Sequence, residues 1–371
     1  MKKILFLIHD LGHGGAEKVL VNLVNNMDRS KFDISVMALF GGGVNEQFLA
    51  KDIRLIVCHK KTIPGNSRLM KLFSPRFLYH HYVQEEYDIV VSYLEGPSAR
   101  IASGCNNPST KIVSWIHCTM KSKKQAAVGF RSLSEAQKCY NRMDAMAFVS
   151  GSVRDAFMKN CGYTGKSHVL FNTNESHLII EKAAQDAALS CKPFIWCGVG
   201  KITPNKGFDR MIRIQQRLSD EGYQAHLYIL GEGPQRSELE KLASKCSVSD
   251  SVTFLGYQTN PYKYVSKCDV FVCASHSEGF STAATEALIV GTPVCTVEVS
   301  GMKEMLGENN EWGIVTDNDD EALYQGIKRL LDDSGLLAHY KKQAEIRGKH
   351  FSTEHTVAAV EQMLLDLTNL S

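Results

Sequence analysis

The sequence predicts an α/β protein built from two domains, each with a parallel sheet. A chain of 371 residues has the length of two domains of ordinary size. Short apolar runs alternate with segments of helical period, which is typical of parallel strands with helices on both faces. The alternation stops in a polar stretch and begins again near residue 194. We therefore place one domain at 1–175, a connection at 172–192, and a second domain at 190–350.

Apolar runs of strand length give the expected strands. In the first domain they lie at 4–8, 34–40, 88–93, 111–116, 145–150 and 169–171, and in the second at 194–199, 225–230, 251–255, 269–274, 294–297 and 313–316. Helical spacing of apolar residues predicts helices at 16–27, 208–219, 235–245, 261–267, 283–290, 320–331 and 353–367. The connection includes an Ala-rich stretch, 181–188, that is polar enough for a surface helix.

The composition is that of an ordinary globular protein, with 44% hydrophobic and 22% charged residues. No run of eighteen apolar residues occurs, so we expect no membrane span. The apolar run after Met1 is short and reaches Asp10 without a small-residue cleavage site. We interpret it as a first strand rather than a signal peptide. The eleven cysteines form no Cys-x-x-Cys pair. This favours reduced core cysteines in a cytoplasmic protein, without metal or disulfides.

Charge is distributed unevenly along the chain. Residues 1–180 carry 23 Lys and Arg against 14 Asp and Glu, a formal charge of +9, and residues 181–371 carry 19 against 26, a charge of −7. A basic half beside an acidic half indicates that the first domain meets an anionic partner.

The junction between the strand at 269–274 and the helix at 283–290 is the strongest candidate for a functional site. Ser281 and Thr282 are candidate N-caps of that helix. A glycine-containing loop that leads into a helix N-terminus suits a phosphate, because backbone N–H groups and the positive end of the helix dipole face it. Glu278 and Glu286 lie there with seven residues between them. Either they accept hydrogen bonds from sugar hydroxyls, or they are a solvated and a helical glutamate.

Three further positions are candidates from their place: Lys201 and His117 at strand ends, and Lys206 at the start of a helix. Lys201 and Lys206 stand beside glycine-rich turns, and they are either diphosphate ligands or surface lysines. His117 ends a strand, where ligands gather in open α/β sheets. A lone histidine is also often structural. The loop Gly12–Gly15 is not Gly-x-Gly-x-x-Gly, so a dinucleotide fingerprint is poorly matched.

These motifs together resemble the retaining glycosyltransferases of the GT-B fold, family 4, whose signature is Glu-x7-Glu. The resemblance covers nearly the whole chain and is strongest from 198 to 313. The motifs occur in the family's order: Gly14-Gly15-Ala16-Glu17-Lys18, His117, Gly200-Lys201, Lys206-Gly207-Phe208, Gly231-Glu232-Gly233-Pro234, Phe254-Leu255-Gly256-Tyr257, Glu278-Gly279-Phe280-Ser281, Glu286-Ala287-Leu288 and Gly291-Thr292-Pro293-Val294. The family often has Arg where Lys201 stands, which keeps the charge but loses the bidentate fork. The resemblance implies two Rossmann-like domains facing each other across a cleft, with a C-terminal helix, 353–371, crossing back onto the first.

The resemblance also implies a role for each candidate residue. Glu286 accepts from the ribose hydroxyls, and Glu278 and His117 contact the transferred sugar. Backbone N–H groups of Phe280, Ser281 and Thr282 face the sugar and phosphate, and Gly256 and Tyr257 hold the base. Lys201 and Lys206 stabilise the diphosphate leaving group in place of a metal. Gly14 and Gly15 allow the donor diphosphate or the acceptor to approach closely.

We therefore expect a hexosyltransferase that moves a sugar, with retention, from a nucleoside diphosphate sugar, UDP-linked, to a saccharide acceptor. The acceptor is expected to be lipid-linked, in cell-surface polysaccharide or glycolipid synthesis. The alternatives are a sugar-nucleotide epimerase of similar two-domain fold and a non-catalytic partner subunit. No cofactor, metal or nucleic acid is expected. The acidic run 317–320 precedes a helix, which favours N-capping over cation binding.

Basic and apolar residues are mixed in two stretches of the first domain. One stretch, 60–80, holds Lys60, Lys61, Arg68, Lys71 and Arg76 among leucines and aromatics, and the other holds Lys121, Lys123, Lys124 and Arg131 near Val128 and Phe130. Such mixtures suit an anionic membrane surface. They are equally typical of a core-facing helix with a solvated basic rim. The first alternative predicts peripheral association with the inner face of a membrane.

Overall fold

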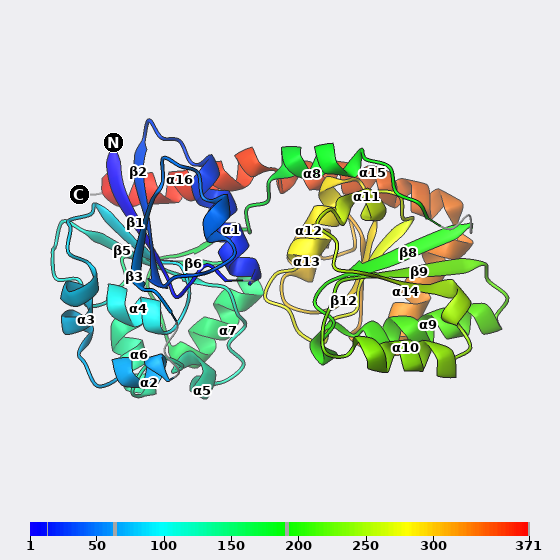
Figure 1. Ribbon diagram of the computed structural model, residues 1–371, viewed down its shortest axis with the longest axis horizontal. Helices are drawn as coiled ribbons and strands as arrows, with labels where there is room; N and C mark the ends of the chain where they lie inside the picture. The colour runs from blue at the N-terminus through cyan, green and yellow to red at the C-terminus, as the bar shows by residue number, and fades with distance from the viewer. Residues whose placement is uncertain (13, 62–64, 190–192, 370–371) are drawn as a thin grey trace. The chain divides into compact units, whose positions relative to one another are not determined.

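The computed structural model describes the chain except for residues 13, 62–64, 190–192 and 370–371 (Figure 1). Parts of the expected glycine-rich loop, basic stretch, connection and last helix lie at these positions, outside the described residues. The chain forms two compact units. Unit 1 is Met1–Asn174 together with Thr353–Ser371, and unit 2 is Glu175–Ser352.

Unit 1 contains a seven-stranded sheet in the order β3-β2-β1-β4-β5-β6-β7, and every neighbouring pair is parallel. Its strands are β1 (Lys2–Ile8), β2 (Phe32–Phe40), β3 (Arg54–His59), β4 (Ile89–Ser92), β5 (Lys111–Ile116), β6 (Ala145–Phe148) and β7 (Ser167–Val169). The central strands are mostly apolar because helices cover both faces, with Ser92 and Ser114 among their few buried polar residues. Leu5, Val90 and Val113 are each 0% exposed.

The helices of unit 1 come from both ends of the chain. They are α1 (Gly15–Asn26), α2 (Asn66–Met70), α3 (Pro75–Tyr82), α4 (Pro97–Ala102), α5 (Lys123–Ala126), α6 (Leu133–Tyr140), α7 (Gly151–Cys161) and α16 (Thr353–Asn369), with the 3₁₀ turn η1 (Glu46–Phe48). The last helix packs against α1, and Glu361 Oε1 accepts from the Asp28 N–H at 2.6 Å. Unit 1 gains the three carboxylates of α16, which has no Lys or Arg, and Glu175 belongs to unit 2. The formal charges of the two units are therefore +7 and −5.

Unit 2 contains a six-stranded parallel sheet in the order β10-β9-β8-β11-β12-β13. The strands are β8 (Phe194–Val199), β9 (Ala225–Leu230), β10 (Val252–Gly256), β11 (Val270–Cys273), β12 (Val294–Val297) and β13 (Ile314–Thr316). Its helices are α8 (Ser176–Ala183), α9 (Phe208–Asp220), α10 (Arg236–Lys245), α11 (Tyr262–Val265), α12 (Thr282–Ile289), α13 (Met302–Leu306), α14 (Asp320–Asp332) and α15 (Ser334–His350), with η2 (Pro204–Lys206) and η3 (Ser249–Ser251). In Figure 1 α9, α10 and α14 cover one face and α8, α11, α12 and α15 the other.

The predicted parallel α/β architecture of both units is confirmed, with differences at several elements. The sequence analysis does not predict β3, an edge strand whose side chains are exposed or half-buried. The expected strand 145–150 ends at Phe148 because the Ser150 side chain accepts from the Val153 N–H and caps α7. The expected helix 181–188 is wrong in its bounds: α8 spans Ser176–Ala183 and packs on α11 and α12, with Ile179 buried.

The strand order fixes where a ligand site is expected in each unit. In each sheet, successive strands are added first toward one edge and then toward the other. This change of side, the topological switch point, lies between β1 and β4 in unit 1 and between β8 and β11 in unit 2. Loops that follow the two strands at such a point diverge and leave a crevice at the carboxyl ends. The loops after β8 and β11 carry Lys201, Lys206 and Glu278, so these candidates lie at the switch point of unit 2.

Two composition-based expectations concern membrane spans and cysteines. Within the described ranges, the helices all fall short of the length and apolar character that a bilayer crossing requires. Cys197, Cys273 and Cys295 are buried and not disulfide-bonded, as predicted. Burial raises the pKa of Cys295 to about 12, so this thiol stays protonated at neutral pH.

Candidate active site

The loop between β11 and α12 forms the centre of the candidate site. Ser281 is the N-cap of α12, and its side chain accepts from the Ala284 N–H at 3.3 Å. This confirms one of the two predicted N-caps, while Thr282 is the first residue of the helix. The backbone N–H groups of Phe280, Ser281 and Thr282 therefore stand at the positive end of an eight-residue helix.

Lys206 and Glu278 meet although 72 residues separate them in the sequence. The Lys206 Nζ donates to Glu278 Oε1 at 2.5 Å, and the Ser275 hydroxyl donates to the same oxygen at 2.7 Å. The Glu278 side chain is 11% exposed and that of Lys206 30%. The stem of Lys206 passes over Gly200, since a Cβ there would lie 3.8 Å from Lys206 Cδ. A cation and a carboxylate are thus held together at the switch point.

Asn205, which the sequence analysis does not single out, fastens the lysine turn to the glutamate loop. Its Nδ2 donates to the Ser277 carbonyl at 2.7 Å, and its own carbonyl accepts from the His276 N–H at 2.8 Å. These two bonds hold η2 and the 275–281 loop in register. The place of Asn205 directly before the motif Lys206-Gly207-Phe208 is the sequence signal that points to it.

Two glycines make this close packing possible. Gly207 has φ +66°, and a Cβ there would lie 2.1 Å from the Ala274 carbonyl oxygen. Gly231 has φ +137°, and its Cβ would lie 1.9 Å from the Gly200 oxygen. Only glycine adopts these conformations without strain and leaves room for the neighbouring backbone. The glycine-rich turns therefore bring the ends of β8, β9 and β11 together.

The other predicted residues of unit 2 lie around this centre. Tyr262 donates from its hydroxyl to Glu286 Oε1 at 3.1 Å, so α11 orients the half-buried Glu286 carboxylate. Lys201 follows β8 and is exposed. Gly256 ends β10 with φ +70°, and the next residue, Tyr257, is 74% exposed. An exposed aromatic ring beside a tight turn is able to stack on a planar ligand.

The acidic run before α14 has structural partners. Asp319 caps α14 by accepting from the Ala322 N–H at 2.8 Å, as predicted. Asp320 pairs with the buried Arg210 at 2.6 Å. Arg210 also donates to the Ala274 carbonyl at 3.1 Å, which ties the carboxyl end of β11 to α14. No cluster of three or more metal-ligating side chains occurs among the residues that the structure describes.

His117 follows β5 in unit 1 and packs among aromatic rings. Its ring centroid lies 4.8 Å from that of Tyr93 and 6.0 Å from that of Trp115. Burial lowers the pKa of His117 to about 3, against the raising effect of a hydrogen bond with the Tyr93 backbone. The imidazole is therefore neutral at neutral pH. Its buried Nε2 has no hydrogen-bond partner within the described part of the chain, so a ligand hydroxyl there would satisfy it.

Carboxylates that the sequence analysis does not predict lie near the same strand ends. Glu95 follows β4 and accepts from the His117 N–H at 3.1 Å. Burial raises the pKa of Glu95, and burial also raises that of Glu17 in the first turn of α1. The signal that finds Glu95 is its place two residues beyond the end of a central strand. Gly14 precedes α1, and a Cβ on Gly15 would have open space around it.

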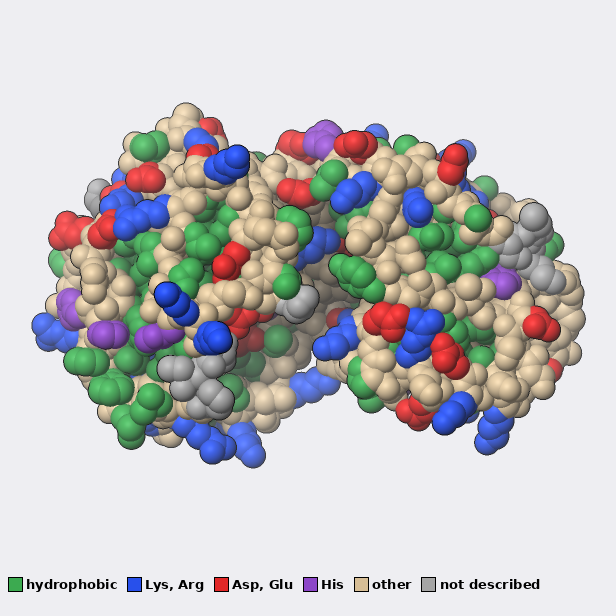
Figure 2. Space-filling model, in the orientation of Figure 1, with side chains coloured by type: hydrophobic (Ala, Val, Ile, Leu, Met, Phe, Trp, Pro, Cys, Tyr) green, Lys and Arg blue, Asp and Glu red, His purple; other side chains and the backbone are tan. Residues whose placement is uncertain are grey.

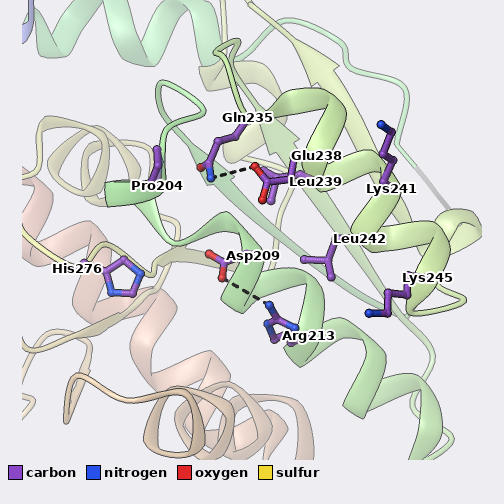
Figure 3. Close-up of a pocket in the computed structure, with 10 residues that line it drawn as sticks. All are labelled: Pro204, Asp209, Arg213, Gln235, Glu238, Leu239, Lys241, Leu242, Lys245 and His276. Carbon is purple, nitrogen blue, oxygen red and sulfur yellow. Dashed lines mark hydrogen bonds and ion pairs between the residues drawn. The ribbon is translucent and has the colours of Figure 1, made fainter.

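A separate cavity in unit 2 contains none of the predicted site residues. It has a volume of about 450 Å³ and lies between α9 and α10, with His276 at one end (Figure 3). Charged side chains of both signs line it, and Asp209 pairs with Arg213 there. We therefore keep the candidate active site at the loops after β8 and β11.

Two family models match this chain, one for each half. Residues 180–347 match the family described as Glycosyl transferases group 1, and residues 13–173 match Glycosyltransferase Family 4. Curated relatives include the N-acetylgalactosamine-N,N'-diacetylbacillosaminyl-diphospho-undecaprenol 4-alpha-N-acetylgalactosaminyltransferase of Campylobacter jejuni, 29% identical over 363 residues, which are 95% of this chain and 96% of the relative. The lipopolysaccharide core biosynthesis glycosyltransferase LpsD of Rhizobium meliloti is 28% identical over 49% of this chain and 52% of its own length.

Solved structures share the fold over the whole chain. HepE of Anabaena in complex with UDP has a TM-score of 0.77 at 19% identity and covers 98% of this chain and 100% of its own. Sucrose-phosphate synthase of Thermosynechococcus elongatus has a TM-score of 0.79 at 20% identity, with 100% of both chains covered. The two family models, the relatives and the doubly wound sheets together show that the chain belongs to the GT-B glycosyltransferases of the family 4 type.

Proposed function

We propose that this glycosyltransferase moves a hexose from a UDP-sugar to a lipid-linked saccharide, with retention of anomeric configuration. The observation that carries the proposal is the Lys206–Glu278 pair at the switch point of unit 2, beside the N-terminus of α12. A cation and a helix N-terminus suit a diphosphate, and a carboxylate suits sugar hydroxyls. The relative from Campylobacter jejuni is named for a diphospho-undecaprenol acceptor, and HepE was solved with UDP.

The donor would bind through groups with distinct roles. Glu286, oriented by Tyr262, accepts from the ribose hydroxyls, and the exposed Tyr257 ring after Gly256 stacks on the base. Lys206 and the exposed Lys201 bind the diphosphate together with the first N–H groups of α12. We propose that these cations replace a metal at the leaving group.

The reaction breaks the bond between the anomeric carbon and the β-phosphate oxygen. The acceptor hydroxyl forms the new bond on the same face, and its proton passes to the departing phosphate of UDP. Negative charge grows on that phosphate in the transition state. The Lys206 ammonium therefore stabilises the transition state more than the bound donor. Glu278, released from Lys206, accepts from hydroxyls of the transferred sugar and orients the ring.

His117 would hold the transferred sugar as a neutral group. Its low pKa removes a role as a general acid at neutral pH. Its buried Nε2 is instead suited to one hydrogen bond with a sugar hydroxyl. Gly14, in the loop before α1, makes room for the Glu17 carboxylate, and Gly15, the first residue of α1, has open space beside it for the donor or acceptor.

The proposed acceptor places the enzyme at the inner face of a membrane. A lipid-linked saccharide stays in the bilayer, so the transferase has to reach the membrane surface to meet it. The formal charge of +7 on unit 1 favours an anionic surface, and a lipid diphosphate adds negative charge of the same kind.

Thermal shift with a panel of nucleotide sugars tests the donor. A ligand at about 100 times its dissociation constant stabilises the folded state by about 2.7 kcal/mol. We expect UDP-sugars to raise the melting temperature of the wild-type protein and to raise that of Lys206→Ala by less. The control Lys245→Ala, at an exposed position, should show the wild-type increase. Radiolabel transfer to a lipid-linked saccharide then tests the reaction. Conversion of the donor to an epimeric sugar without any acceptor would instead show an epimerase.

A further inference from the structure

Unit 1 exposes a group of large apolar side chains around α2 and α3. Leu69, Leu72, Phe73 and Phe77 are 52%, 73%, 41% and 52% exposed, and we call these four residues the apolar tip. Figure 2 shows apolar side chains gathered at the lower left, on the side where Figure 1 places α2 and α3. Scattered exposed leucines are ordinary, but a contiguous group of this size marks an interaction site.

Two arginines hold the backbone of the tip in place. Arg100 is 1% exposed and donates to the carbonyls of Met70 at 2.8 Å and Phe73 at 2.6 Å. Arg131 donates to the carbonyls of Lys71, Leu72 and Phe73. Every carbonyl from residue 70 to residue 73 therefore accepts from a guanidinium group. The fold fixes this loop while its side chains point into solvent.

A small apolar pocket lies beneath the tip. It has a volume of about 250 Å³ and is lined by residues that include Phe40, Leu69, Met70, Phe73 and Phe77. Side-chain rings in contact connect the tip to the carboxyl end of β1, in the order Phe73, Phe77, His81, Tyr82, His59, Phe40 and His9, with centroid separations from 4.8 to 6.0 Å. The apolar surface thus continues inward from the tip to the strand end that opens the glycine-rich loop.

Basic side chains outnumber acidic ones around the tip, where Glu135 pairs with Arg100 and Arg131. The segment 53–84 has six Lys and Arg and no Asp or Glu, and the segment 96–134 also has six and none. The bonds from Arg131 to residues 71–73 bring the two segments together. A surface with an excess of basic side chains around an apolar centre complements a bilayer that has anionic headgroups outside and hydrocarbon beneath.

We propose that unit 1 docks on an anionic phospholipid membrane by inserting the apolar tip, with the surrounding cations on the headgroups. Leu72 and Phe73 enter the headgroup layer, and the lysine stems lie along it with their charges at the phosphates. Each lysine or arginine near an anionic surface strengthens binding about fivefold. The role of docking, delivery of a lipid-linked acceptor, rests on the proposed function, whereas the docking itself does not.

Co-sedimentation of the full chain with vesicles tests the docking. We expect binding to phosphatidylcholine vesicles that contain phosphatidylglycerol, weak binding to phosphatidylcholine alone, and a decline with added salt. The double variant Leu72→Asp, Phe73→Asp should bind at least tenfold more weakly. Ile346→Asp, at a residue of unit 2 that is 58% exposed, is the matched control and should bind like wild type. Lys121→Gln, Lys123→Gln and Lys124→Gln together should weaken binding without removing it.

Three outcomes would overturn the proposal. They are equal binding to both vesicle types, wild-type binding by the Asp double variant, and binding that requires a polyprenyl phosphate rather than anionic phospholipid. The last would assign the pocket to the chain of the acceptor. Transfer to a water-soluble, short-chain acceptor separates the claims, because the double variant should retain wild-type turnover there if only docking is lost. Melting curves of all variants should match, since the substituted side chains are exposed.

Discussion

Replacing Glu278 with Gln should raise the affinity for UDP while it lowers turnover. In the unliganded protein Lys206 Nζ donates to Glu278 Oε1 at 2.5 Å. If Lys206 binds the diphosphate, the donor has to replace this carboxylate partner. Glu278→Gln keeps the shape of the side chain but removes its charge. The lysine then meets the diphosphate without a competing anion.

The structure gives the size of the expected change. A hydrogen bond to a charged group contributes about 1.5–3 kcal/mol. The Lys206 side chain is 30% exposed, so solvent screening reduces the cost of separating the pair to about 1–2 kcal/mol. We therefore expect UDP to bind about 5- to 30-fold more tightly to Glu278→Gln. Turnover should also fall, because the sugar hydroxyls lose the Glu278 carboxylate as a hydrogen-bond acceptor. The loss of transition-state stabilisation should be about 1–4 kcal/mol.

Isothermal titration with UDP measures the affinity, and steady-state transfer measures the turnover. The control is the same substitution in a Lys206→Ala background, where the gain in UDP affinity should disappear. Unchanged or weaker UDP binding by Glu278→Gln would refute the reasoning, since Lys206 would then not exchange the carboxylate for the diphosphate. Wild-type turnover by the variant would remove Glu278 from the proposed mechanism.

Four further predictions concern the donor, the metal, pH and the fold. Glu286→Ala should weaken UDP binding by about 1–3 kcal/mol in titration, and wild-type affinity would contradict the ribose contact. Sugar transfer should persist in excess chelator. If the chelator abolished activity and added magnesium or manganese restored it, a metal would act at the leaving group. Between its ordinary value of 6.5 and its lowered pKa of about 3, His117 binds a proton only in the unfolded chain. In urea unfolding, the free energy of unfolding should therefore fall as the pH is lowered from about 6.5 to about 3. The slope should be smaller in His117→Asn by up to about 1.4 kcal/mol per pH unit, and equal slopes would contradict the burial of the ring. Gly231→Ala should lower the free energy of unfolding by at least about 2 kcal/mol. Gly222→Ala, where φ is also positive but a Cβ meets open space, is the control and should cost much less. Equal melting temperatures of the two variants would refute this.

The sequence predicts those features that local pattern controls. Apolar runs mark most strands of both sheets because parallel strands are buried on both faces. Ser281 is recognisable as an N-cap since its own side chain makes the cap within three residues. The edge strand β3 is not predicted, because half-exposed positions blur its pattern.

Contacts between distant residues are beyond such patterns. The pairing of Lys206 with Glu278 depends on two loops meeting where the sheet reverses direction, which only the strand order decides. Nothing local indicates that Arg131 binds the backbone of residues 71–73. The lowered pKa of His117 likewise comes from burial of its ring, which packs against Tyr93 at the end of the neighbouring strand β4.

The return of α16 to unit 1 has a consequence for the order in which the protein is completed on the ribosome. Unit 2 occupies residues 175–352, so its chain is synthesised before the last helix is made. Unit 1 meanwhile lacks Val360, Met363 and Leu364, which are at most 3% exposed in the finished protein. Of the two units, the one that is started first is therefore finished last. A premature stop just before the codons of α16 would damage unit 1 and leave unit 2 intact.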